Sequence, residues 1–192
     1  TKRPGRMAFW ADNMAEVCRE RGLPWSWPPN VWAGTSCESQ KYAPRLDCLA
    51  RVPAKVRFVS AEPLLGPLDL SQWLEPGTFD AGGSREWFNE ASVVQWTIVG
   101  GESGPGARPM HLGWARDLRD QCAKAGVPFF MKQIGRNPLW IGEGEPPPGH
   151  IYLEYLGRSL WRLDLLGDLK GGDPQDWPSD LRVREMPAEE RG

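Results

Sequence analysis

The sequence contains few residues of the kinds that most metal and redox sites require. It has only two histidines, His111 and His150, and these lie far apart. Its four cysteines are scattered between residues 18 and 122, and none of them forms a C-x-x-C pair. Zinc ribbons and iron–sulfur motifs need closely spaced ligands, so the sequence predicts no such site, and we expect most of the cysteines to be core thiols.

Long apolar runs and a strong net charge are also absent. No apolar run reaches the roughly 20 residues that cross a bilayer, and the opening residues lead us to expect no signal peptide. We therefore expect a cytoplasmic protein that does not contact the membrane. The formal net charge of −2 over 192 residues does not support a nucleic-acid partner, although a local basic patch would allow one.

Short apolar segments alternate with amphipathic segments through most of the chain. We expect strands at residues 31–36, 55–61, 93–99 and 127–135, and helices at 6–21, 39–51 and 113–124. Strands that alternate with helices pair in parallel through right-handed crossovers. The sequence thus predicts an α/β fold with about four parallel strands, as a small open sheet or a partial (β/α) barrel. Pro44 is expected to lie in the first turn of the second helix or to kink it.

The last quarter of the chain has a different pattern. A loop rich in proline and glycine follows residue 136, and two weakly alternating segments, 151–156 and 159–164, predict a hairpin that turns at Gly157. We therefore expect a barrel domain at 1–136, with a loop, a hairpin and a polar tail at 137–192 packed on it.

Acidic side chains follow three of the predicted strands. Glu38, Glu62 and Glu102 lie one to three residues after the ends of three strands, and Lys132 lies near the end of the fourth. Because the carboxyl ends of parallel strands meet on one side, we expect these four residues to share a catalytic pocket. The alternative is that each acid separately caps the next helix or faces water.

Small and polar residues accompany these charged groups. Gly100 and Gly101 would let a ligand approach the backbone closely. The other residues expected to bind a cofactor are Thr35, Ser36, Ser60, Ser103 and Gln133.

Neighbouring carboxylates raise one another's pKa unless a positive group lies among them. Lys132, a metal ion or the amine of a substrate would fill that role. With a divalent ion, the three glutamates would suit a metal-dependent hydrolase, although histidine and aspartate are missing from the strand ends. Two further expectations concern arginines. Arg108 binds an anion or forms a salt bridge to the helix after it, and Arg116 and Arg119 belong to a solvated helix face.

Five long segments carry a resemblance to a known family. They are VWAGTSCES (31–39), RFVSAEPLLGPLDL (57–70), WTIVGGESGPGARPMH (96–111), WARDLRDQCAKAGVPFFMKQIG (114–135) and GGDPQDWPSDLRVREMP (171–187). In these segments the chain closely resembles the phage gene product 37/68 family, which has no settled function and is thought to be related to radical SAM enzymes.

The resemblance implies a fold and a cofactor. Family members usually carry, upstream of a TKRP segment, a three-cysteine motif like the one that holds a [4Fe–4S] cluster. This chain starts at that segment and resembles the C-terminal half of a partial (β/α) barrel. The resemblance implies that this chain forms part of a pocket that binds S-adenosylmethionine and an unidentified substrate. It implies a [4Fe–4S] cluster only where the upstream part is present. We expect the chain alone to be inactive.

A third hypothesis is a non-catalytic binding module. A sheet of four strands has unpaired edges, which invite the missing N-terminal half, another partner or a second copy of the chain.

Overall fold

Four parallel strands form the main sheet of the protein. The structure is a computed structural model, and it describes residues 5–77, 92–140, 150–155, 158–163 and 169–188. The strands are β1 (Ala33–Ser36), β2 (Arg57–Ala61), β3 (Trp96–Gly100) and β5 (Phe129–Gln133). They pair in the order β1-β2-β3-β5, all in parallel. The predicted α/β fold is confirmed, and this order matches consecutive strands of a (β/α) barrel.

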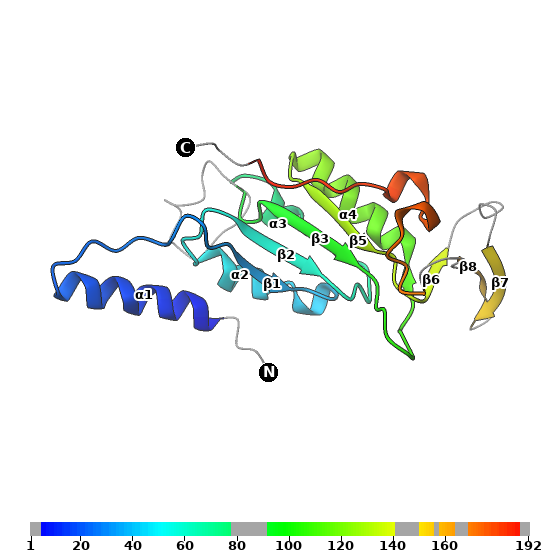
Figure 1. Cartoon of the computed structure of the whole chain (residues 1–192), viewed down its shortest axis with the longest axis horizontal. Helices are drawn as coiled ribbons and strands as arrows, with labels where there is room; N and C mark the ends of the chain where they lie inside the picture. The colour runs from blue at the N-terminus through cyan, green and yellow to red at the C-terminus, as the bar shows by residue number, and fades with distance from the viewer. Residues whose placement is uncertain (1–4, 78–91, 141–149, 156–157, 164–168, 189–192) are drawn as a thin grey trace.

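Helices cover one face of this sheet. They are α2 (Arg45–Ala50), α3 (Ser71–Leu74) and α4 (Leu112–Ala125), and they lie on the far side of the strands in Figure 1. Burial alternates accordingly along β3, where Thr97 and Val99 are fully buried while Trp96 and Ile98 are half-buried. The hydrophobic core therefore lies between the sheet and the helices.

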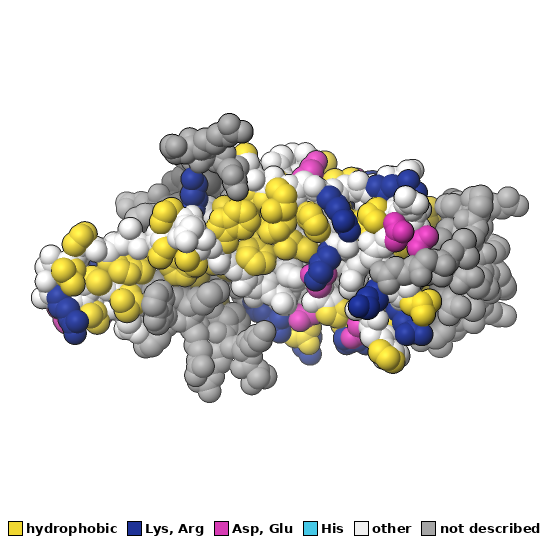
Figure 2. Space-filling view, viewed as in Figure 1, with side chains coloured by type: hydrophobic (Ala, Val, Ile, Leu, Met, Phe, Trp, Pro, Cys, Tyr) yellow, Lys and Arg dark blue, Asp and Glu magenta, His cyan; other side chains and the backbone are white. Residues whose placement is uncertain are grey.

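The opposite face of the sheet carries aromatic side chains. We call Trp32, Phe58, Trp96 and Phe130 the aromatic face. The Trp96 ring centroid lies 5.8 Å from each of the other three ring centroids. Each of the four side chains is half-buried, and Figure 2 shows hydrophobic side chains exposed over the strands in this view. No helix of the described part of the chain covers this face.

A second sheet was only partly predicted. It has the order β4-β6-β8-β7 and consists of β4 (Met110–His111), β6 (Pro138–Trp140), β7 (His150–Tyr155) and β8 (Arg158–Leu163). The antiparallel pair β7–β8 is the predicted hairpin, whose turn at Gly157 lies outside the described residues. The strands β4 and β6 were not predicted, because two or three residues carry too little alternation to be recognised.

The C-terminal tail packs on the β5 edge of the main sheet. It contains two short 3₁₀ helices, η3 (Pro174–Asp176) and η4 (Ser179–Leu181). The Met131 N–H donates to the Val183 carbonyl at 2.8 Å, and Arg184 forms an antiparallel bridge with Phe130. Trp177 and Leu181 are buried. The tail thus adds side chains to the core and covers part of one sheet edge.

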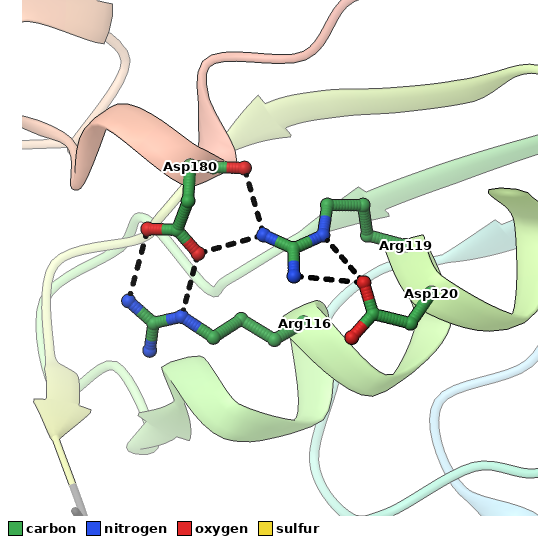
Figure 3. Close-up of polar contacts among 4 residues, drawn as sticks. All are labelled: Arg116, Arg119, Asp120 and Asp180. Atoms are coloured by element: carbon green, nitrogen blue, oxygen red, sulfur yellow. Dashed lines mark hydrogen bonds and ion pairs between the residues drawn. The ribbon is translucent and has the colours of Figure 1, made fainter.

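Two arginines of α4 bind the tail. Asp180 accepts hydrogen bonds from Nε of Arg116 at 2.7 Å and from Nη1 of Arg119 at 2.7 Å, and Arg119 also pairs with Asp120 (Figure 3). The Arg116 and Arg119 side chains are 20% and 23% exposed. The predicted solvated helix face is therefore wrong for these two residues, because the tail covers them.

The predicted helix over 39–51 is divided in two. It consists of the short 3₁₀ helix η1 (Gln40–Tyr42) and of α2, and Pro44 lies between them as the N-cap of α2. Proline has no N–H to continue a preceding helix, which explains the break. The N-terminal helix α1 (Gly5–Glu20) extends away from the sheet in Figure 1. No described helix is both long and apolar enough to cross a membrane.

Candidate functional site

The carboxyl ends of the four strands lie along one edge of the main sheet. We call residues 36–38, 60–65, 100–103 and 132–136 the strand-end edge. Backbone hydrogen bonds join its segments, since Leu65 N–H donates to the Glu38 carbonyl and Leu64 N–H to the Gly100 carbonyl, both at 2.8 Å. Gly101 N–H donates to the Gln133 carbonyl at 3.0 Å. These bonds fix the backbone that carries the predicted site residues.

Glu62 lies at the centre of this edge, beside Lys132 as predicted. Its Oε2 accepts from Ser60 Oγ at 3.1 Å and from Lys132 Nζ at 3.2 Å. The Glu62 side chain is 16% exposed, whereas that of Lys132 is 56% exposed. Oε1 of Glu62 is buried and has no hydrogen-bond partner within the described residues. One oxygen of this carboxylate is therefore buried without a hydrogen-bond donor from the described residues.

Gly100 and Gly101 make room for atoms of the protein itself. A Cβ on Gly100 would lie about 2.4 Å from Oε1 of Glu62, so only glycine lets that carboxylate lie over the end of β3. A Cβ on Gly101 would lie 2.5 Å from the carbonyl oxygen of Ile134. The paired glycines therefore have structural roles here, and Gly100 positions the Glu62 carboxylate.

Glu102 forms the most complete ion pair of the edge. Its two oxygens accept from Nε and Nη2 of Arg108, each at 2.9 Å, and from the Arg108 backbone N–H at 2.8 Å. The hydrogen bonds from the Arg108 side chain and backbone lower the pKa of Glu102 to about 2. Glu102 therefore stays ionised at neutral pH. Arg108 pairs with this acid and not with the helix that follows it.

Glu38 has a separate cation, Arg45. Nη1 of Arg45 donates to Glu38 Oε2 at 3.0 Å and to the Ser36 carbonyl at 2.8 Å, and the guanidinium lies 4.3 Å from the centroid of the Tyr42 ring. The pKa of Arg108 is raised first by its bond to Glu102 and further by the charges of Glu38 and Tyr42. The Glu38 and Glu102 pairs are therefore electrostatic neighbours.

The four predicted catalytic residues thus belong to three separate ion pairs. The structure brings Glu62, Lys132, Ser60 and Gly100 together, and it gives Glu38 and Glu102 cations of their own. Thr35 pairs with Val59 within the sheet, and Ser103 is half-buried in the loop after β3. The remaining candidates, Ser36 and Gln133, form hydrogen bonds that involve backbone carbonyls. The Ser36 carbonyl accepts from Arg45, and the Gln133 amide donates to the Gly101 carbonyl at 2.8 Å.

Metal ligands do not gather at this edge. The part of the chain that the structure describes holds no group of three or more His, Cys, Asp and Glu side chains that could bind a metal ion. The four cysteines are free, and burial raises the pKa of both Cys37 and Cys122 to about 11. Such thiols stay protonated at neutral pH and are poor metal ligands.

Sequence reasoning missed the role of Arg45. It lies seven residues after Glu38 and beyond a proline, so no helical i, i+4 spacing connects the two. The break at Pro44 turns α2 so that its first residue, Arg45, reaches the Glu38 carboxylate. Only the position of an arginine at a helix start after an acidic strand end could have suggested this pair.

Comparison with known proteins shows the family of the chain. The family described as "Protein of unknown function (DUF5131)" matches residues 1–146. The chain therefore belongs to this family. No curated protein and no solved structure matches it.

Proposed function

We propose that this member of the DUF5131 family is the cofactor- and substrate-binding part of a radical-SAM-like protein, as its resemblance to the phage gene product 37/68 family implies. Four parallel strands in chain order, with helices on one face, are the arrangement that half of a (β/α) barrel requires. Such barrels place their ligands at the carboxyl ends of the strands, where Glu62 and Lys132 meet.

The observation that carries the proposal is the unpartnered oxygen of Glu62. A buried carboxylate oxygen without a donor loses the hydrogen bonds that water would give it. Oε2 already accepts from Ser60 and Lys132, while Oε1 accepts from no described residue. A ligand with an ammonium group or a hydroxyl group would supply the missing donor. Because Oε1 is buried, such a ligand would reach it only if neighbouring side chains moved, and the exposed Lys132 side chain would be the first to do so.

S-adenosylmethionine fits this donor requirement, since it carries an ammonium group and two ribose hydroxyls. Glu62 would accept from one of these donors, and Ser60 would keep the carboxylate oriented. In radical SAM proteins, a reduced [4Fe–4S] cluster makes this cofactor a source of an organic radical. The free cysteines of the described residues do not form a cluster-binding group, so the cluster does not fit this part of the protein. We therefore assign binding, and not cofactor cleavage, to this chain.

Titration calorimetry with S-adenosylmethionine tests the proposal. We expect binding by the wild-type chain and a loss of about tenfold or more in affinity for Glu62→Gln, because a hydrogen bond to a charged group contributes about 1.5–3 kcal/mol. Glu102→Gln is the matched control, since that carboxylate is already saturated by Arg108. Equal affinities for the wild type and Glu62→Gln, or no binding by the wild type, would contradict the proposal.

A metal-dependent hydrolase is the weaker alternative. Each of the three glutamates has its own Lys or Arg partner, and the described residues contain no three-ligand metal group. Calorimetry with Mg²⁺ and Mn²⁺ on the wild type and on Glu102→Gln would detect a shared metal site. Equal heats from both proteins would remove this alternative.

One observation favours a pairing role as a second candidate function. The tail covers part of the β5 edge, whereas the outward backbone groups of Gly34, on the β1 edge, form no hydrogen bond with a described residue. A strand from a partner or from a second copy of the chain would pair there and extend the sheet. Light scattering at two protein concentrations tests the second-copy form, and a strictly monomeric chain would count against it.

A further inference from the structure

The charged groups of the strand-end edge form two layers. In each of its three ion pairs, the cation is more exposed than the acid: 56% against 16% for Lys132 and Glu62, and 57% against 32% for Arg108 and Glu102. The Arg45 and Glu38 side chains follow the same order, with 31% against 23%. A ligand that approaches this edge therefore meets the cations before the carboxylates.

Two more cations add to the outer layer. Lys41 lies in η1 directly after the Glu38 segment, with its Nζ 5.8 Å from the centroid of the Tyr42 ring. Arg136 is held beside the Glu102 pair, because its backbone N–H donates to the Glu102 carbonyl at 2.8 Å. Both side chains are exposed, and neither forms an ion pair with a described residue. The outer layer thus has more positive charge than the three acids beneath it neutralise.

We propose that this outer layer binds the phosphate groups of a nucleotide-containing substrate. Lys and Arg side chains are the usual partners of phosphate, and the stacking of Arg45 on Tyr42 orders its guanidinium. The cations extend from the end of β1 to the end of β5, which suits several phosphates better than one. The half-buried Trp96 and Phe130 of the adjacent aromatic face offer contacts to bases.

The inference rests on the proposed function for the place of the site and adds the class of substrate. It also gives the two layers separate roles. The inner carboxylate of Glu62 suits the positive groups of the cofactor, and the outer cations suit the negative groups of the substrate. The net charge of the whole chain, −2, conceals this local excess of positive charge.

Fluorescence anisotropy with a labelled single-stranded oligonucleotide, and calorimetry with ATP, test the inference. The test variant combines Lys41→Gln and Arg136→Gln. It removes two cations that form no ion pair with a described acidic residue. The matched control is Arg21→Gln with Arg51→Gln, which removes two exposed cations before β1 and before β2, away from the strand ends. We expect the first variant to weaken binding about fivefold or more and to lower the salt slope by about 1.4, at about 0.7 per phosphate contact on a single strand. The control should leave both values unchanged.

The outcomes separate the sources of phosphate and the two proposals. Tighter binding of the oligonucleotide than of ATP identifies a nucleic acid, and the reverse identifies a free nucleotide. No binding of either probe, equal losses in the two variants, or tighter binding of an acidic peptide of the same charge would overturn the inference. The double variant retains Glu62, so its affinity for S-adenosylmethionine should match the wild type. Loss of cofactor binding in Glu62→Gln alone therefore tests the proposed function separately.

Discussion

The two faces of the main sheet differ in what covers them. On one face, Val59, Val99 and Met131 are fully buried beneath helices. On the other, the aromatic face is half-buried and visible at the surface (Figure 2). Neighbouring residues of one strand thus meet different surroundings, because successive side chains of a strand point to opposite faces.

This difference separates stability from recognition. The covered face contributes most of the buried apolar area, and the tail adds Trp177 and Leu181 to it. The aromatic face leaves large apolar side chains partly in water, where they contribute less to folding and remain available to a ligand or partner. Two substitutions of the same kind, one on each face of the sheet, should therefore change the free energy of unfolding by different amounts.

The largest effect is expected from the adjacent residues Met131 and Phe130. Met131→Ala should lower the free energy of unfolding by about 2–5 kcal/mol, because it leaves a cavity in the closed core. Phe130→Ala should cost less, about 1 kcal/mol, although phenylalanine is the larger side chain, since its ring is only half-buried. Urea denaturation followed by circular dichroism measures both. Equal losses would mean that the aromatic face is as well covered as the other.

A glycine substitution at the strand-end edge should have the next largest effect. Gly101→Ala places a Cβ 2.5 Å from the Ile134 carbonyl oxygen and 2.9 Å from the Cα of Gly135, so backbone must move. We expect a loss of about 1–3 kcal/mol in the free energy of unfolding. Gly104→Ala is the control in the same loop, because nothing lies within 4 Å of its added Cβ. A thermal melt should separate the two variants, and unchanged stability in Gly101→Ala would show that this edge is loosely packed.

A smaller effect on the free energy of unfolding is expected from Asp180, through which the tail binds α4. Burial would raise the pKa of Asp180, but hydrogen bonds and charge from Arg116 and Arg119 lower it below its ordinary value. Its stabilisation is then present above the ordinary carboxyl pKa and is lost as pH falls through the lowered one. Because Asp180 is 41% exposed, water screens the pair, and Asp180→Asn should cost about 1 kcal/mol or less at pH 7. Denaturation of the wild type and Asp180→Asn between pH 7 and pH 3 should give converging stabilities, whereas a constant gap would contradict the pairing.

Local patterns in the sequence were enough to predict the strands of the main sheet. Each of these four strands contains an apolar run bounded by turn residues, and such a run is visible without knowledge of its partners. The predicted strand ends in turn indicated Glu62 and Lys132, which the structure places 3.2 Å apart. This part of the site follows from parallel topology alone.

Local sequence patterns could not show in the same way which face of the main sheet is covered and which is the aromatic face. The tail depends on long-range contacts, such as that of Asp180 with Arg116, which lies 64 residues earlier in the chain. Such a pair has no local pattern in the sequence, and the charged residues of α4 therefore suggested a solvated surface. The role of Gly100 is equally non-local, because the space it leaves is filled by Glu62, which follows the end of β2.

The smallest effect on folding is expected from the exposed ion pair of the strand-end edge. Arg108 lowers the pKa of Glu102 to about 2, so Arg108→Gln should raise that pKa toward the ordinary value of about 4.3. Exposed pairs contribute little to stability, so the melting temperature should stay nearly unchanged. A carboxyl ¹³C NMR titration measures the pKa, and Arg119→Gln, on the covered side, should leave it unchanged. If Glu102 already titrates near pH 4 in the wild type, the pair does not persist in solution and the outer layer of cations is less ordered than its geometry indicates.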